Sequence, residues 1–227
     1  LIIAGSLCGL AFGRFMKENL KQTLMVVSGI IVLLLGMSGA MQYMLVIVNG
    51  TLQTTGPMLM IISMVAGAVI GELIDLNRWI TVFGDWVKAK TGNTGDPQFT
   101  HAFITASLTF TVGAMGVLGS IQDGLTGNYQ TLLLKGILDG IIVMVMVSSM
   151  GKGALFSFIP VGITQWIITA MAHIAAPLMT PSAIDNLSYV GSILIFCVGI
   201  DLIWPGKIRI ANLLPAIFVA MGLTFLL

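Results

Sequence analysis

An aspartate and a lysine lie four residues apart inside one long apolar stretch of the chain. Asp139 is eight residues into a stretch that begins near Thr131. If that stretch is a helix crossing a bilayer, a rise of about 1.5 Å per residue places the carboxyl roughly 12 Å deep in a hydrocarbon core about 30 Å thick. An ionisable group at that depth is a candidate for function by default. Lys135, one turn away on the same face, would partly neutralise it. The pair is therefore either a structural ion pair or part of a polar binding site.

The preceding apolar stretch ends in a glycine-rich run, residues 113–124, which closes on Gln122-Asp123-Gly124. This density of glycine predicts a helix that breaks near the outer leaflet, although a plain helix followed by a turn also fits. A broken membrane helix is tolerated only where it is buried in protein or lines a cavity. We therefore expect Gln122 and Asp123 to line an outward-facing polar site together with Asp139.

Two further polar residues fall within apolar stretches, and each fits an interhelical hydrogen bond as well as a ligand contact. They are Gln165 and Asn212, the latter beside Pro215. The candidate ion- or substrate-binding residues are thus Asp139, Asp123, Gln122, Lys135, Gln165 and Asn212.

Enzymatic signals are weak. Gly36-Met37-Ser38-Gly39 is similar to the serine motif of rhomboid proteases, with His173 as a possible base, but the order of apolar stretches does not match that family. Two distant histidines predict no zinc site. No nucleotide-binding fingerprint follows a strand, and no basic stripe suggests nucleic acid. We expect no enzyme activity, cofactor or metal, and an intramembrane serine protease is the least favoured alternative.

Composition decides the class of protein. Hydrophobic residues make up 57% of the chain, charged residues 8%, and the mean hydropathy is +1.03. Ordinary soluble domains are about 25% charged, so the bilayer is the expected surrounding. We predict one all-α transmembrane domain over residues 1–227 with about eight spans, 1–13, 22–48, 57–74, 99–121, 131–150, 153–176, 183–204 and 208–227. The first is shorter than the about 20 residues that a span requires, so we expect residues upstream of it.

Basic residues predict the orientation. Apart from Lys135, every Lys and Arg falls in alternate gaps between the apolar stretches, namely the first (Arg14, Lys17, Lys21), the third (Arg78, Lys88, Lys90), the fifth (Lys152) and the seventh (Lys207, Arg209). Cytoplasmic loops of membrane proteins are enriched in Lys and Arg, so both termini are expected outside the cytoplasm. Asp201, near the same end, is expected to pair with Lys207 or Arg209.

The long third gap predicts an amphipathic helix over residues 77–90. Trp79, Val82, Phe83 and Trp86 recur there at helical spacing, which is typical of a helix lying in the membrane interface. That helix either anchors the protein or has a gating role.

Small residues recur at equal separations and suggest internal repeats. Gly29 and Gly36 are spaced as Ser192 and Gly199 are, in a stretch expected to run the opposite way. This pattern fits an inverted repeat of the kind found in secondary transporters. Glycine at ordinary helix contacts explains it equally well.

Several motifs resemble the bacterial YdfK/YqgA-like family of small integral membrane proteins, a domain of unknown function (DUF554). They are Val112-Gly113-Ala114-Met115, Leu118-Gly119-Ser120-Ile121-Gln122-Asp123-Gly124, Leu138-Asp139-Gly140 and Ile210-Ala211-Asn212-Leu213-Leu214-Pro215-Ala216. The resemblance implies a bacterial inner-membrane protein and assigns no functional residue.

The function that we expect is that of a small inner-membrane transporter or permease for an ion or small solute, either uncoupled or coupled to protons or another cation. A channel is the nearest alternative, and a membrane assembly or stress factor is a third. A chain of 227 residues makes a thin bundle, so its partners are expected to be the lipid bilayer and a second copy in a homodimer.

Overall fold

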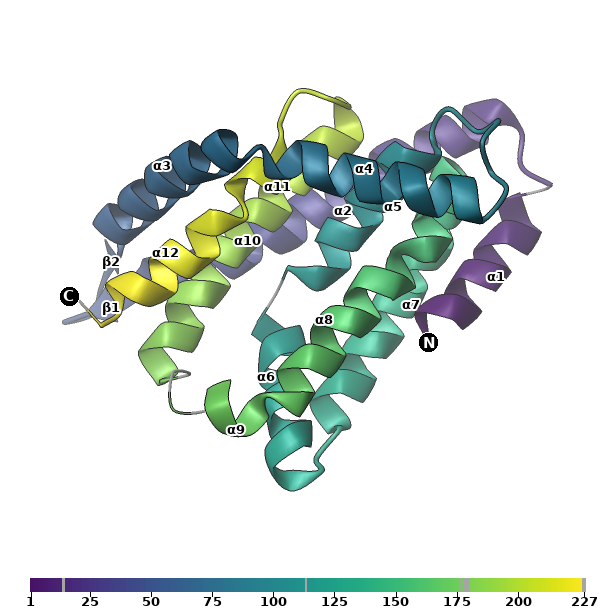
Figure 1. The fold of residues 1–227 in the computed structure, drawn as a ribbon. Helices are drawn as coiled ribbons and strands as arrows, with labels where there is room; N and C mark the ends of the chain where they lie inside the picture. The colour runs from purple at the N-terminus through teal and green to yellow at the C-terminus, as the bar shows by residue number, and fades with distance from the viewer. Residues whose placement is uncertain (14, 113, 176, 178–179, 226–227) are drawn as a thin grey trace.

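The protein is an all-α bundle with one small β-hairpin, as a computed structural model shows (Figure 1). The structure describes residues 1–13, 15–112, 114–175, 177 and 180–225. In chain order its elements are α1 (Ile2–Gly13), α2 (Glu18–Met44), β1 (Leu45–Val48), β2 (Thr51–Thr54), α3 (Pro57–Ile74), α4 (Leu76–Lys90), α5 (Phe99–Thr111), α6 (Ala114–Thr126), α7 (Gln130–Met150), the 3-10 helix η1 (Lys152–Ser157), α8 (Phe158–Ala170), α9 (Ala172–Ala175), α10 (Pro181–Ile203), α11 (Ile210–Leu213) and α12 (Pro215–Leu223).

The predicted all-α, polytopic membrane fold is confirmed. Within the described residues, five helical segments are long and apolar enough to cross a membrane, and the bent pair α5 and α6 makes a sixth if it counts as one span. The segments Ile2–Gly13 and Ile210–Leu223 are apolar but shorter. A total of eight spans therefore stays a prediction.

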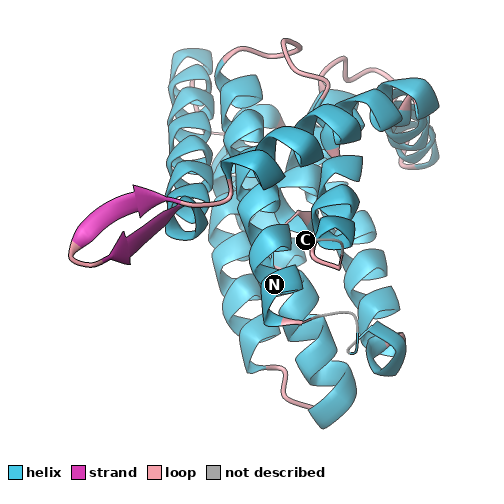
Figure 2. Ribbon diagram, turned by 90° about the vertical axis from the view of Figure 1, so that its left-hand side faces the viewer, coloured by secondary structure: helices cyan, strands magenta, loops and turns pink. Residues whose placement is uncertain are grey.

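Two predicted spans have different boundaries in the structure. The span 22–48 ends as a helix at Met44, and the chain continues into a hairpin that projects from the bundle (Figure 2). Its turn is Asn49-Gly50, and both residues adopt positive φ, 52° and 76°. Asn-Gly is favoured in two-residue hairpin turns for this reason. The predicted span 99–121 is divided into α5 and α6.

Glycine lets three helix pairs approach closely. On the parallel helices α1 and α7, a Cβ at Gly5 would lie 2.8 Å from the Gly140 carbonyl carbon. On the antiparallel helices α2 and α10, a Cβ at Gly36 would lie 2.6 Å from Phe196 Cα. Gly71 at the end of α3 packs in the same way on the backbone of Asn212. Membrane helices lack a strong hydrophobic drive to associate, so close backbone approach stabilises them. Such contacts require glycine whether or not the chain contains an internal repeat, so the glycine spacing does not by itself indicate one.

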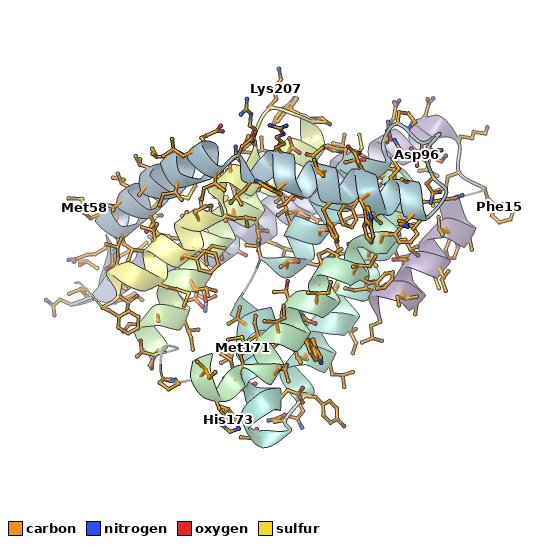
Figure 3. The ribbon with its side chains drawn as sticks, in the orientation of Figure 1. Phe15, Met58, Asp96, Met171, His173 and Lys207 are labelled. Carbon is orange, nitrogen blue, oxygen red and sulfur yellow. The ribbon has the colours of Figure 1, made fainter. Side chains whose placement is uncertain are left out.

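The basic connections meet at one end of the bundle. Lys21, Asp96 and Lys152 line one cavity of about 350 Å³, which joins the first, third and fifth gaps. Arg209 in the seventh gap forms an ion pair with Glu72 at 2.9 Å, beside the third gap. Figure 3 shows Lys207 and Asp96 at this end and His173 at the opposite end. The alternation in the sequence therefore corresponds to one common face.

Helix α4 lies across the same end (Figure 1). Gly84 and Val87 are buried against the bundle, and the Phe83 ring packs on Phe103 of α5 with centroids 5.8 Å apart. Trp79 and Trp86 are exposed. The helix thus holds the start of α5 on one side and presents an apolar surface on the other.

Candidate functional site

The centre of the candidate site is the interruption between α5 and α6. Helix α5 ends at Thr111, Val112 is extended (φ −81°, ψ 114°), and the two helices are bent by 59°. In a continuous helix the Phe110 carbonyl would accept a hydrogen bond from the amide four residues later. The extended residue removes that geometry, so the end of α5 requires another donor.

Lys135 of α7 supplies that donor. Its ammonium donates to the Phe110 carbonyl oxygen at 2.9 Å and forms an ion pair with Asp139 on the same helix. Lys135 is 7% exposed and Asp139 8%. The C-terminal end of a helix carries about half a negative charge, which favours a cation there. The predicted pairing of Lys135 with Asp139 is observed, and the capped carbonyl explains why a lysine is buried.

The depth of Asp139 in a bilayer stays a prediction, but its position along α7 is observed. It lies near the middle of the 21-residue α7, so the site is at mid-depth if α7 spans the membrane. Asp139 lines two cavities of about 330 Å³ each. One lies between α2, α5, α7 and α10, and the other between α1, α7 and α8.

Gln165 is the one further predicted residue that the fold brings to the pair. It lines the second of these cavities together with Asp139. A Cβ at Gly116 of α6 would meet Lys135 Cε at 3.2 Å and Gln165 Nε2 at 3.6 Å. Gly116 therefore leaves the space in which the lysine stem and the glutamine amide lie together.

Gln122 and Asp123 do not join Asp139, contrary to the expectation from sequence. Gln122 accepts a hydrogen bond from the Thr131 hydroxyl at 2.7 Å, and Thr131 precedes Asp139 by eight residues, about 12 Å along α7. Asp123 is half-buried and lines neither cavity. Helix α5 ends at Thr111, twelve residues before Asp123. Gly124 serves a close helix contact instead, since a Cβ there would meet Ala172 Cβ at 2.5 Å.

Asn212 also lies away from the ion pair. Its side-chain oxygen accepts the backbone N–H of Asn77 at 2.6 Å, at the start of α4. It is 1% exposed, and its Nδ2 atom has no hydrogen-bond partner among the described residues. Asn212 therefore attaches α4 to α11, which is the interhelical role.

The serine and threonine residues of the first cavity were missed by sequence reasoning. Thr109, Ser188 and Ser192 line it, and each hydroxyl donates its proton to the carbonyl four residues earlier in its own helix. Their oxygen lone pairs stay available as acceptors. Serine and threonine are ordinary in membrane helices, so only packing distinguishes these three from the others.

A second polar pair was also missed. His101 Nε2 lies 3.3 Å from Asp201 Oδ2, and Asp201 Oδ1 accepts the Gly206 amide at 2.8 Å. The expected pairing of Asp201 with Lys207 or Arg209 is therefore wrong. Its carboxylate instead contacts His101 of α5 and the turn after α10. The pair lines a cavity of about 420 Å³ at the basic end of the bundle.

Among the residues that the structure describes, Ser38 has no basic side chain as a hydrogen-bond partner. Its hydroxyl donates to the Leu35 carbonyl of its own helix at 3.0 Å, and His173 is exposed on α9.

Fold and site together define a polytopic helical membrane protein with an interrupted helix closed by a buried ion pair. The chain belongs to the family described as "Protein of unknown function (DUF554)", which matches residues 1–225. It is 27% identical over 228 aligned positions to "Uncharacterized membrane protein YdfK" of Bacillus subtilis (strain 168), covering 100% of this chain and 93% of that protein. It is 27% identical over 173 positions to "Uncharacterized protein YqgA" of Escherichia coli (strain K12), covering 73% and 72% respectively. No solved structure matches.

Proposed function

We propose that this protein is a small transporter or permease for an ion or small solute. The observation that carries the proposal is the interrupted helix at mid-bundle whose end carbonyl faces a buried ion pair beside a cavity. Secondary transporters commonly bind substrates near the membrane midplane at discontinuous helices, whose ends supply unpaired backbone dipoles. An ion pair that served stability alone would not need a cavity on either side.

The cavities support a binding site rather than a wide pore. Each has about 330 Å³, which lies at the lower end of the range of small-molecule pockets. Asp139 lines both cavities, so a change in the contact between Asp139 and Lys135 would affect both of them. A membrane assembly or stress factor would need no such arrangement.

The test is flux through liposomes that contain the purified protein. A thermal-shift screen against ions and small metabolites first identifies ligands, because a ligand of the native state raises its apparent stability. A carrier then shows saturable uptake, whereas a channel shows flux that rises in proportion to concentration. Asp139→Asn should abolish uptake. Asp123→Asn is the matched control and should retain it, since Asp123 lines neither cavity. Uptake that survives Asp139→Asn but not Asp123→Asn would place the site elsewhere.

We also propose a bacterial inner-membrane location with both termini outside the cytoplasm. Support comes from the common face of the basic connections and the positive-inside rule. In a background with both native cysteines replaced by serine, cysteine at Lys207 or Lys90 should react with an impermeant maleimide only after spheroplasts are permeabilised. Cysteine at Asn49 should react in intact spheroplasts. The reverse pattern would invert the orientation.

A non-enzymatic role and a homodimer complete the proposal. The Ser38 hydroxyl donates within its own helix, which does not activate a nucleophile. Fluorophosphonate labelling that disappears in Ser38→Ala would contradict this and indicate a protease. Light scattering of the protein in detergent, corrected for bound detergent, should give twice the mass of the chain; a monomer mass would exclude the dimer.

A further inference from the structure

We propose that the end of α5 is a monovalent-cation site, in which the Lys135 ammonium occupies the place that a transported or coupling cation takes when the lysine side chain withdraws. This inference rests on the proposed transport function and names its substrate class as small cations, either alkali-metal ions or primary ammonium compounds.

The fixed charges at this place favour a cation. The Phe110 carbonyl is at the negative end of a 13-residue helix, and the Asp139 carboxylate adds a full negative charge. Lys135 alone opposes them. When its ammonium withdraws, a carbonyl and a carboxylate oxygen stay behind without a cation in a buried position, at high cost in free energy. A second cation would relieve that cost.

The cavity lining favours the same charge. Thr109, Ser188 and Ser192 all donate their hydroxyl protons to their own helices, so that they present acceptor oxygens. Such oxygens match ammonium hydrogens and alkali-metal ions. The other neutral polar residues of the lining, Gln42 and Tyr43 of α2, can both accept and donate hydrogen bonds. An anion in this cavity would have only Lys135 as a positive partner, and Asp139 would repel it.

Within the described part of the chain, the Lys135 ammonium has fewer acceptors than it has donors. Lysine has three N–H donors, and among the residues that the structure describes only Phe110 and Asp139 accept from Lys135. Its stem passes Gly116, where a Cβ would approach Cε to 3.2 Å. A flexible four-carbon stem beside a glycine can change position with little displacement of the backbone. In this proposal Lys135 leaves the two oxygens by rotation of its side chain.

Chemical replacement of the lysine provides the test. Lys135→Ala removes the ammonium and leaves the carbonyl, the carboxylate and the space of the side chain. We expect the purified variant to unfold at a lower temperature than wild type and ethylammonium chloride to restore much of the loss. Tetramethylammonium chloride at equal ionic strength should not, because it has no N–H donor. A ligand at about 100 times its dissociation constant shifts the folding equilibrium about 100-fold.

Three controls make the result specific. Lys152→Ala, at an exposed lysine, should show no difference between the two salts. Adding Asp139→Asn to Lys135→Ala should remove the rescue. If Lys135→Ala yields no folded protein, Lys135→Ser, whose short side chain leaves most of the same space, takes its place with the same pair of salts. Equal effects of both salts, or no effect of either, would overturn the cation site.

Uptake by wild-type protein separates the two proposals. Rescue by ethylammonium together with saturable cation uptake supports both. Rescue without any uptake supports the cation site and refutes transport. Saturable uptake of a neutral or anionic solute without rescue supports transport and refutes the cation site.

Discussion

A single methyl group at Gly36 should separate the two helices that pack most extensively in the bundle. Helices α2 and α10 cross there, and a Cβ at Gly36 would lie 2.6 Å from Phe196 Cα and 2.8 Å from the Ser192 carbonyl oxygen. Ordinary van der Waals contact of a Cβ begins near 3.4 Å. Because both obstacles are backbone atoms, no side chain can turn away, and the helices must move apart by about 1 Å. Such overpacking costs about 1–3 kcal/mol.

The matched control is Gly162→Ala in α8. Nothing lies within 4 Å of a Cβ at that position. Alanine is favoured over glycine inside a helix by roughly 0.5–1 kcal/mol, so this variant should be neutral or slightly more stable. Both substitutions add the same methyl group to a helix, and only the surroundings differ.

Unfolding in mixed micelles with increasing sodium dodecyl sulfate, followed by tryptophan fluorescence, measures the difference. Trp204 lies at the C-terminal cap of α10 and reports on the unfolding of that helix. We expect the unfolding midpoint of Gly36→Ala to fall clearly below that of Gly162→Ala. Because Ser192 beside this contact also lines the first cavity, ligand binding should weaken in Gly36→Ala as well. Equal midpoints for the two variants would refute the close approach of α2 and α10.

Three further perturbations test separate contacts in the same assay. Asp139→Leu leaves the buried Lys135 ammonium without its carboxylate and should lower the free energy of unfolding by about 3–5 kcal/mol. The double variant with Lys135→Met should lose clearly less stability than the sum of the two single variants, and additive losses would contradict the ion pair. Asn212→Ala removes the acceptor of the Asn77 amide and should lower the free energy of unfolding by about 1–3 kcal/mol. Hydrogen exchange at the Asn77 amide should become faster, and unchanged exchange would exclude this hydrogen bond. Gly50→Ala places a side chain at φ 76° and should lower the free energy of opening of the hairpin, measured by hydrogen exchange, by about 1 kcal/mol. The unfolding midpoint should stay constant, because the β2 strand and turn are exposed. A lower midpoint would mean that the hairpin stabilises the bundle.

Sequence patterns were reliable where one local cause decided the structure. The apolar stretches form helices because backbone groups in lipid must bond within their own segment. The spacing of four residues between Lys135 and Asp139 put both on one face of α7, and their ion pair follows from helix geometry. Asn49-Gly50 carried an equally local signal for a hairpin turn, and it was overlooked because the apolar residues before it continue the pattern of the preceding helix.

Other expectations failed where glycine had two possible roles. A glycine-rich run can mark either a break or a close contact, and the sequence does not distinguish them. In α6 the contact prevails at Gly124, which packs on Ala172. The interruption lies instead after Thr111, where Val112 is extended. Gln122 and Asp123 were placed at the site on the basis of the wrong break.

Pairings between distant segments were decided by packing. His101 and Asp201 are 100 residues apart and meet because α5 and α10 lie together at the basic end. Likewise, nothing local indicated that Lys135 would cap the carbonyl of Phe110 on another helix.

By itself, the sequence determined the membrane environment, the helical class, the common face of the basic connections and the buried acid with its lysine. Each of these depends on hydropathy, charge or helical spacing within one segment. Only the tertiary structure decided where the helix is interrupted, which polar side chains surround the ion pair and which serve helix contacts. These features depend on which helix backbones approach one another. The type of a residue does not indicate which residue 25 or more positions away will contact it.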